Sequence, residues 1–481
     1  MFYNTDCERV LHYFKELCKI PHGSGDTKRV SDYCVDFAKQ HGLRYVQDEL
    51  NDVIIFKDGT EGFENHEPVI IQGHLDMVCE KESGVDFDFT TDALNIEIEG
   101  DFISAKGTTL GGDDGIAVAY ALALLESTTI EHPPIEAVFT VDEETGMFGA
   151  AGIDTSVLRG KRLLNVDSEE EGILLVSCAG GRRQDLELPV RRESREGVLF
   201  KITVGGLEGG HSGTEIDKGR ANASIELAKV LRRIREVSDF GIKTMAGGLK
   251  DNAIPREAEA VIVTNPRKTQ LIEISVGEME KILKFRYRDT DPDMFIKAEV
   301  VGDGEFEVTD DESTVNILAL MSEVPNGVQK MSEDIEGLVQ TSLNMGIMEL
   351  KEEWFSVRFA LRSSVNREKE ELSKKLEKII TYYNGTNECS GDYPAWEFRK
   401  GSKLTDIIAE EYERLSGKKL LIQSIHAGLE CGIISTNYPK MDMVSFGPTL
   451  MSPHSPTERV EIPTVEKFYS LVKALVVNGV L

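Results

Sequence analysis

The first third of the chain alternates short apolar strands with helices, and each strand ends in acidic or histidine residues. We expect three strands, at residues 67–76, 134–144 and 161–170. The helices expected around them lie at residues 7–20, 27–42 and 115–127. Apolar strands separated by helices are typical of a mainly parallel sheet covered on both faces. Because ligands of such sheets bind at the carboxyl ends of the strands, we expect the polar strand ends to form a site.

The pattern changes near residue 186, where strands begin to alternate polar and apolar side chains and amphipathic helices appear between them. This pattern favours an antiparallel sheet with helices on one face. After about residue 394 the pattern resembles the first part again. We therefore predict an α/β domain split into residues 1–185 and 394–481, with an α+β domain of residues 186–393 inserted between the two parts.

Length and composition narrow the function classes. A chain of 481 residues is expected to form two or three domains. It has no apolar run long enough to span a bilayer, and its first residues do not resemble a signal peptide. Its seven cysteines form no C-x-x-C pair. Together these features favour a cytoplasmic protein. The net charge of −30 argues against nucleic acid or an anionic membrane as a partner.

Two motifs of the first part place chemically active side chains next to strand or helix ends. In GHLD (73–76), His74 and Asp76 are two residues apart on a strand, so they point to the same side. That spacing suits a carboxylate that orients a ligand histidine, although a solvated strand end explains it equally well. In LGGDDG (110–115), Asp113 and Asp114 begin an apolar helix. N-capping explains one aspartate more easily than two.

Three further motifs add possible metal ligands. DEETG (142–146) places Glu143 and Glu144 after a buried strand, where carboxylates repel one another unless cations or protons compensate them. Asp167 is the first polar side chain past the third strand, while the glutamates after it are expected to be surface charges. His454 lies in the proline-rich loop SPHSPTE. Two histidines and three carboxylates at the strand ends of one domain supply the ligands that zinc, cobalt or manganese prefer.

The succession GHLDMV, LGGDDGIA, DEETGMFGA, NVDSEEEG and SPHSPTE resembles the M20 clan of co-catalytic metallopeptidases. Within that clan the chain is most similar to the aminoacyl-histidine (Xaa-His) dipeptidases, also called peptidase D. The motifs GGHSG (209–213), NAIPREA (252–258) and HAGLECG (426–432) extend the resemblance over nearly the whole chain. The resemblance implies a zinc-exopeptidase-like catalytic domain with an inserted lid and dimerisation domain. It also implies a homodimer formed through the lid.

The resemblance further implies roles for individual residues and a reaction. Two divalent cations, zinc or else cobalt or manganese, would activate a water molecule that hydrolyses small peptides of the Xaa-His type. The sequence leaves open whether β-alanyl-histidine is among them. Glu143 would be the general base, Asp76 would orient His74, and His211 of the lid would stabilise the oxyanion. The implied metal ligands are His74 and Asp167 at one cation, Glu144 and His454 at the other, and Asp113 between them.

Substrate contacts and the exact reaction leave alternatives open. Asn252 and Arg362 are candidates for binding the substrate's carboxylate, but Asn252 could cap a turn before Pro255 and Arg362 could form an ordinary strand salt bridge. His426 is a substrate contact or a structural hydrogen-bonding group. The GGDDG motif leaves the choice between Asp113 and Asp114 open. A tripeptide aminopeptidase or an N-acyl amino acid amidohydrolase would share the metal ligands. A non-catalytic homologue would be expected to have lost a metal ligand or the general base.

Overall fold

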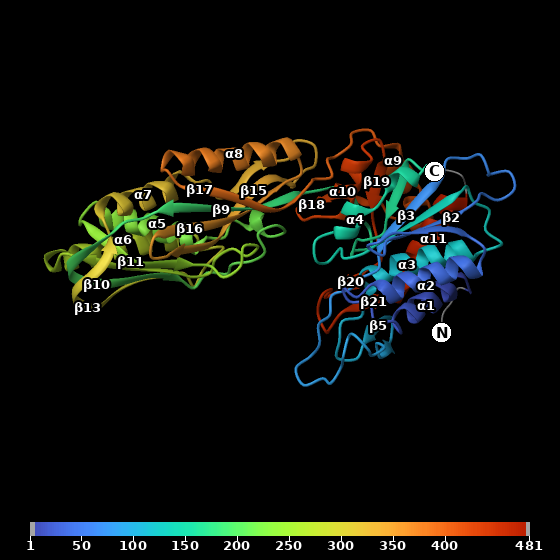
Figure 1. Ribbon diagram of the computed structural model, residues 1–481, viewed down its shortest axis with the longest axis horizontal. Coiled ribbons are helices and arrows are strands. Elements are labelled where there is room, and N and C mark those ends of the chain that lie inside the picture. The colour runs from blue at the N-terminus through green and yellow to red at the C-terminus, as the bar shows by residue number, and fades with distance from the viewer. Residues whose placement is uncertain (1–4, 478–481) are drawn as a thin grey trace. The chain divides into compact units, whose positions relative to one another are not determined.

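The computed structural model describes residues 5–477, which divide into two compact units (Figure 1). The first unit contains the described residues up to Cys178, then Trp396–Ser424 and the described residues from Leu429 onward. The second unit contains Ala179–Ala395 and the short segment Ile425–Gly428. No helix within residues 5–477 is long and apolar enough to cross a membrane.

The division differs from the predicted boundaries mainly at two places. A boundary after residue 185 would cut β9 (Gly180–Pro189), which pairs with its neighbours along its whole length. The change in strand pattern is visible only within this strand, because its first residues, Gly180 and Gly181, carry no side chain that could show alternation. The segment that carries His426 also belongs to the second unit, although the prediction assigned residues 394–481 to the first domain.

The first unit is built on an eight-stranded mixed sheet in the order β1-β2-β6-β3-β7-β19-β8-β18. Its centre, β6-β3-β7-β19, is parallel, and antiparallel pairs flank it. β3 and β6 are buried along their whole length, as their continuous apolar sequences predict. The strands are β1 (Arg44–Gln47), β2 (Val53–Lys57), β3 (Val69–His74), β6 (Ile135–Thr140), β7 (Arg162–Asn165), β8 (Ile173–Cys178), β18 (Leu421–Ile425) and β19 (Asp442–Ser445).

Helices and a small second sheet complete the first unit. α1, α2 and α3 lie on one side of the main sheet (Figure 1), and α3 is apolar on nearly every side because α1 and β3 both pack against it. The small sheet has the order β20-β21-β5-β4. The helices are α1 (Thr5–Leu17), α2 (Lys28–Gln40), α3 (Gly112–Glu126), α4 (Phe148–Gly152), α9 (Lys403–Ser416), α10 (Glu430–Asn437) and α11 (Ile462–Val477). The small-sheet strands are β4 (Ile96–Glu99), β5 (Phe102–Ala105), β20 (Leu450–Met451) and β21 (Arg459–Glu461).

The second unit is an antiparallel sheet in the order β13-β10-β12-β11-β15-β16-β9-β17, with β14 paired to β15. Its strands alternate buried and exposed residues, and α5, α6, α7 and α8 pack on the sheet to enclose an apolar core. The strands are β9, β10 (Arg192–Gly205), β11 (Phe240–Gly247), β12 (Ala258–Thr264), β13 (Phe295–Thr309), β14 (Gly327–Met331), β15 (Val339–Leu350), β16 (Trp354–Ser363) and β17 (Thr386–Tyr393). The helices are α5 (Ala223–Arg235), α6 (Thr269–Arg286), α7 (Asp311–Glu323) and α8 (Asn366–Tyr382).

The architecture confirms the predicted fold class. The C-terminal strand β19 returns to the centre of the first sheet beside β7, so the α/β unit is split by an inserted α+β unit. Three of its central strands, β3, β6 and β7, are the three apolar strands that the sequence predicts.

Candidate active site

The parallel sheet of the first unit brings the polar strand ends to one edge. His74 is the last residue of β3 and pairs with Thr140, the last residue of β6. Glu143 and Glu144 follow β6 within a few residues, and Asp167 follows the end of β7. Because β3 lies between β6 and β7, side chains from all three strand ends meet around His74.

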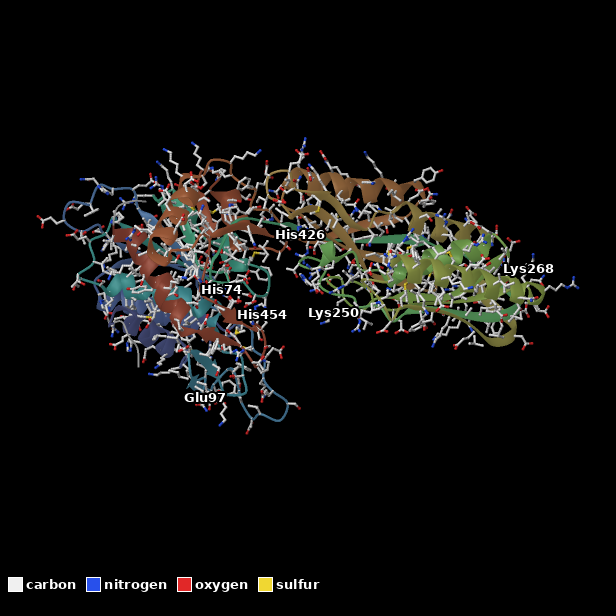
Figure 2. All side chains as sticks on the ribbon, turned by 180° about the vertical axis from the view of Figure 1, so that it is seen from behind. His74, Glu97, Lys250, Lys268, His426 and His454 are labelled. Atoms are coloured by element: carbon white, nitrogen blue, oxygen red, sulfur yellow. The ribbon has the colours of Figure 1, made fainter. Side chains whose placement is uncertain are left out.

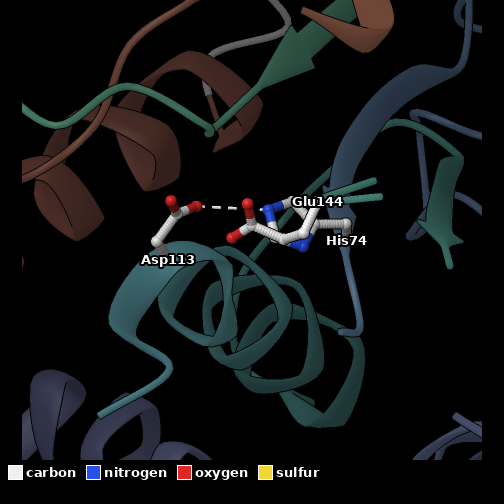
Figure 3. Close-up of side chains that lie close together, drawn as sticks. All are labelled: His74, Asp113 and Glu144. Carbon is white, nitrogen blue, oxygen red and sulfur yellow. Dashed lines mark hydrogen bonds and ion pairs between the residues drawn. The ribbon is translucent and has the colours of Figure 1, made fainter. Parts of the chain in front are cut away.

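Asp113 lies between the two histidines. Its Oδ1 is 3.1 Å from Nε2 of His74, and its Oδ2 is 3.2 Å from Nε2 of His454. Nε2 of His454 is also 3.0 Å from Oε1 of Glu144. Figure 3 shows the side chains of His74, Asp113 and Glu144 converging, and Figure 2 labels His74 and His454 in the same unit. The two oxygens of one carboxylate therefore face two different histidines.

Asp167 is farther from this pair, with Oδ1 3.9 Å from Nε2 of His74. Among residues 5–477, two groups of side chains have ligand atoms close enough to share a metal ion. One consists of His74, Asp113 and Glu144, and the other of His74, Asp114 and Asp167. The structure thus brings all five predicted ligands together, and it adds Asp114 to the cluster.

The N-capping explanation of the GGDDG motif is wrong. The N-cap of α3 is Gly111, which has no side chain, and neither aspartate caps the helix. Asp113 and Asp114 have non-helical backbone angles, and the peptide bond between them is cis. Asp114 is buried, and its Oδ2 accepts a 3.2 Å hydrogen bond from the backbone N–H of His74. Both aspartates therefore face the strand ends.

Asp76 supports His74 from the side opposite to Asp113. The Nδ1 of His74 is 3.0 Å from the backbone oxygen of Asp76 and 3.4 Å from its Oδ1. A proton on Nδ1 leaves the lone pair of Nε2 directed at the cluster, which is the tautomer that a metal ligand requires. The same carboxylate accepts bonds from Ser24 Oγ (2.7 Å) and from the backbone N–H of Glu143 (3.1 Å). Asp76 thus fixes both the imidazole and the loop that carries Glu143 and Glu144.

The cluster carries more negative charge than its histidines offset. Burial is the main cause that raises the pKa of Glu143 to about 8, and the nearby carboxylates of Glu430, Glu144 and Asp113 add to the shift. Burial and neighbouring carboxylates also raise the pKa of Asp114 and Asp167 well above their usual range. Uncompensated buried carboxylates are costly, whereas bound cations would offset their charge. Nitrogen and oxygen donors with this surplus of negative charge fit divalent metal ions.

Two buried glutamates beside the cluster are not predicted by the sequence. Oε2 of Glu430 accepts bonds from Gln72 Nε2 and from Thr140 Oγ1 (2.6 Å), which lie on β3 and β6 just before His74 and Glu143. Glu458 accepts backbone N–H groups from the segment that leads to Asp113. Both lie in motifs already noted, HAGLECG and SPHSPTE. In the sequence each appears only as a single glutamate inside a motif. A single glutamate does not indicate which distant residues will donate hydrogen bonds to it.

Two predicted lid residues, His211 and Arg362, converge in the second unit with His426, which the prediction had assigned to the catalytic domain. A Cβ added to Gly213 would lie 2.6 Å from the backbone oxygen of His426, 3.0 Å from Cε1 of His211 and 3.1 Å from Nε of Arg362. Arg362 makes no salt bridge in the part of the chain that the structure describes. It donates from Nη1 to the hydroxyl of Tyr393 at 3.0 Å, and its Nε is buried without an acceptor among those residues. The strand salt bridge considered for Arg362 is therefore not formed.

His211 has a defined tautomer. Its Nδ1 lies 3.3 Å from the backbone N–H of Gly213 and 3.2 Å from that of Thr214, and both N–H groups donate to it. The ring proton of neutral His211 is consequently on Nε2, where it can be donated to an anionic oxygen. Burial and then the charge of Arg362 lower the pKa of His211, which favours this neutral form.

His426 and Asn252 differ in their surroundings. His426 is buried, and its Nε2 forms a 2.7 Å hydrogen bond with Ser342 Oγ, so the structural role considered for it is present. Burial is the main cause that lowers its pKa to about 3, followed by the charges of Arg362 and His211. Asn252 is exposed, and its backbone oxygen accepts from the N–H of Ser212. Asn252 lines a separate surface pocket of about 400 Å³ to which Arg362 does not contribute.

Comparisons with known proteins identify the family of the chain. The family model described as peptidase family M20/M25/M40 matches residues 70–478. The chain belongs to this peptidase family. It is 36% identical over 464 residues to the cytosol non-specific dipeptidase of Escherichia coli, and the match covers 96% of each chain. The crystal structure of aminoacylhistidine dipeptidase from Vibrio alginolyticus matches with a TM-score of 0.93 and 36% identity, over 98% of each chain.

A more distant structure shares the fold alone. The aminopeptidase PepT from Bacillus cereus matches with a TM-score of 0.56 and 15% identity over 98% of each chain. Family membership identifies the chain as a peptidase of a metal-dependent family.

Proposed function

We propose that this peptidase hydrolyses dipeptides of the Xaa-His type, including β-alanyl-histidine, with two divalent cations. The observation that carries the two-cation proposal is the position of Asp113, whose two carboxylate oxygens each face a different histidine at 3.1 and 3.2 Å. Such a carboxylate would be able to contribute one oxygen to each of two cations. The dipeptide preference is supported by the names of the two relatives that match nearly the whole chain.

The proposed ligand set uses five side chains. His74 and Asp167 would hold one cation, Glu144 and His454 would hold the other, and Asp113 would contribute to both. We prefer Asp113 to Asp114 as the bridge because Asp114 already accepts the backbone N–H of His74. Zinc is the proposed metal, and cobalt or manganese would suit the same nitrogen and oxygen donors. When bound, the cations would polarise the scissile carbonyl and lower the pKa of the attacking water.

The protein's own groups supply the remaining steps. Glu143 takes a proton from the attacking water on its carboxylate and passes it to the nitrogen of the leaving amine. Asp76 holds His74 in its ligand tautomer and holds the backbone of Glu143 in place. His211 donates its Nε2 proton in a hydrogen bond to the oxygen that becomes negative in the tetrahedral intermediate.

Substrate recognition is assigned to the second unit. Arg362 has a buried Nε without an acceptor among residues 5–477, and a guanidinium binds a carboxylate in a bidentate manner. We propose that it binds the substrate's C-terminal carboxylate, with His426 beside it. We also propose Asn252 as a substrate contact. Its backbone oxygen accepts a hydrogen bond from the N–H of Ser212, the residue after His211.

The proposed assembly is a homodimer formed through the second unit, in the cytosol. α6 exposes an apolar stripe of Leu271, Ile274, Ile282 and Phe285, the last with 72% of its surface exposed. The edge strand β13 beside it exposes Val300 and Val301. Exposed apolar side chains along a helix and on an edge strand are a typical interaction surface.

An assay on a substrate panel tests the proposed function. The panel contains Xaa-His dipeptides, β-alanyl-histidine, tripeptides and N-acetyl amino acids, with protein that is native, stripped by a chelator, and reloaded with zinc, cobalt or manganese. We expect cleavage of dipeptides, loss of activity on stripping and recovery on reloading. Activity that survives complete metal removal would refute the cation proposal. A preference for tripeptides or N-acetyl amino acids would refute the dipeptide assignment.

A further inference from the structure

Glu458 is a buried glutamate that joins two loops of the candidate metal centre. Only 2% of its surface is exposed. Its Oε2 accepts the backbone N–H groups of Leu110 (2.7 Å) and Gly111 (3.2 Å), and its Oε1 accepts those of Gly112 (2.8 Å) and Asp113 (3.4 Å). Four consecutive N–H groups therefore converge on one carboxylate.

The two glycines before Asp113 allow the backbone to bring these N–H groups close to the carboxylate of Glu458. Gly111 has a left-handed φ of 69°, which turns the chain so that successive N–H groups point to one side. A Cβ on Gly112 would lie 2.5 Å from Cγ2 of Val460 and 3.2 Å from Oε1 of Glu458. The sequence GGD thus forms a cradle for an anion, and the chain fills it with its own Glu458.

The two loops joined in this way carry two of the five proposed ligands. His454 and Glu458 lie in the same loop, four residues apart, while Asp113 is the last residue of the cradle. His74 ends a buried strand and Asp167 follows another, whereas His454 has a φ of 56° and a side chain that is 49% exposed. The sheet therefore fixes His74, but it does not fix His454 against Asp113.

We infer that Glu458 is a positioning residue that sets the separation between Asp113 and His454 and thereby the affinity of the metal centre. The inference rests on the proposed function, because it assumes that these two side chains bind cations. Glu458 itself has no place as a ligand, since both of its oxygens are occupied by backbone N–H groups. Groups that orient metal ligands typically change metal affinity by about 10–100-fold when they are removed.

The substitution Glu458→Gln separates this role from simple packing. Glutamine keeps the shape but replaces one acceptor oxygen with an NH₂ group, which meets two N–H donors of the cradle instead of bonding to them. We expect the dissociation constant for zinc, measured by competition with a chromogenic chelator, to rise by about 10–100-fold. Activity should recover at saturating zinc. Glu458→Asp keeps the charge on a shorter side chain. Its dissociation constant for zinc should lie between those of the native protein and of Glu458→Gln.

Glu136→Gln is a matched control in the same unit. Glu136 is 1% exposed and accepts the backbone N–H groups of Arg159 (3.0 Å) and Gly160 (3.0 Å) at the opposite end of β6. Both glutamine variants should lower the melting temperature of the metal-free protein by a similar amount, because each leaves buried N–H groups without an acceptor. Only Glu458→Gln should weaken zinc binding.

The outcomes separate the inference from the proposed function. If the native protein binds no zinc, the proposed function fails. If the native protein binds zinc and Glu458→Gln binds it within about twofold, the positioning role is refuted. Equal loss of zinc affinity in Glu136→Gln would also refute it, because the effect would then be one of general stability. If Glu458→Gln does not fold, native zinc affinity in Glu458→Asp would overturn the inference.

Discussion

Asp52 gives a prediction about stability that does not depend on metal or substrate. Its side chain is buried with 2% of its surface exposed, and its Oδ1 accepts the backbone N–H of Val141 at 2.9 Å. Burial is the main cause that raises its pKa from 3.8 to about 8, and the nearby carboxylate of Asp48 adds to the shift. The folded protein therefore holds a proton on Asp52 over a range of pH in which the unfolded chain has lost it.

The sign of the pH dependence follows from this difference. Between the two pKa values the folded state binds more protons, so the free energy of unfolding falls as the pH rises. The slope for one group is about 1.4 kcal/mol per pH unit, which amounts to roughly 2.7 kcal/mol between about pH 5 and about pH 7. Both of these pH values lie about one unit or more inside the window from 3.8 to about 8.

The substitution Asp52→Asn should abolish this contribution. Asparagine keeps an oxygen for the N–H of Val141 and remains neutral at every pH. Urea unfolding of metal-free native protein and variant, each at about pH 5 and about pH 7, gives a double difference in which all other titrating groups cancel. We expect the native protein to lose roughly 2–3 kcal/mol more than the variant between the two pH values. Equal losses in the two proteins would refute a neutral, buried Asp52.

Three further predictions concern the proposed reaction and assembly. Glu143→Gln should lower kcat by about 10²–10⁴-fold, because the proton acceptor is lost, while zinc affinity measured by chelator competition stays within about twofold; full activity would remove Glu143 as the base. His211→Ala should lower kcat by about 10²–10³-fold in steady-state assays, with zinc affinity unchanged, because an oxyanion donor is lost; undiminished turnover would exclude that role. Phe285→Glu should convert a dimer to a monomer in analytical ultracentrifugation. The control Leu249→Glu changes a residue that is 95% exposed but lies outside α6 and β13, so it should remain a dimer. A dimer in both variants would place the interface elsewhere.

The sequence predicts those parts of the fold that depend on local patterns. The continuous apolar strands β3 and β6 and the amphipathic helices are evident because burial repeats along each element. The convergence of His74, Glu144 and Asp167 also follows, since neighbouring parallel strands place their carboxyl ends at one edge. The start of β9 was not predictable, because two glycines there show no alternation.

The supporting residues were not predictable because their partners lie far away in the chain. Glu430 reaches β3 and β6, and Glu458 reaches the start of α3, through contacts that no periodicity encodes. The return of His426 to the second unit depends in the same way on long-range contacts, among them its bond to Ser342. A single acid or histidine inside a loop carries no signal for such partners.

The buried carboxylates of the first unit can be sorted by what compensates their charge. Glu136 and Glu458 each accept several backbone N–H groups, so they are satisfied within the protein. Asp113, Glu144 and Asp167 instead face histidines and one another. A buried carboxylate without enough donors requires a cation or a proton. The first kind joins loops within the protein. We propose the second kind as metal ligands, because bound cations would offset their charge.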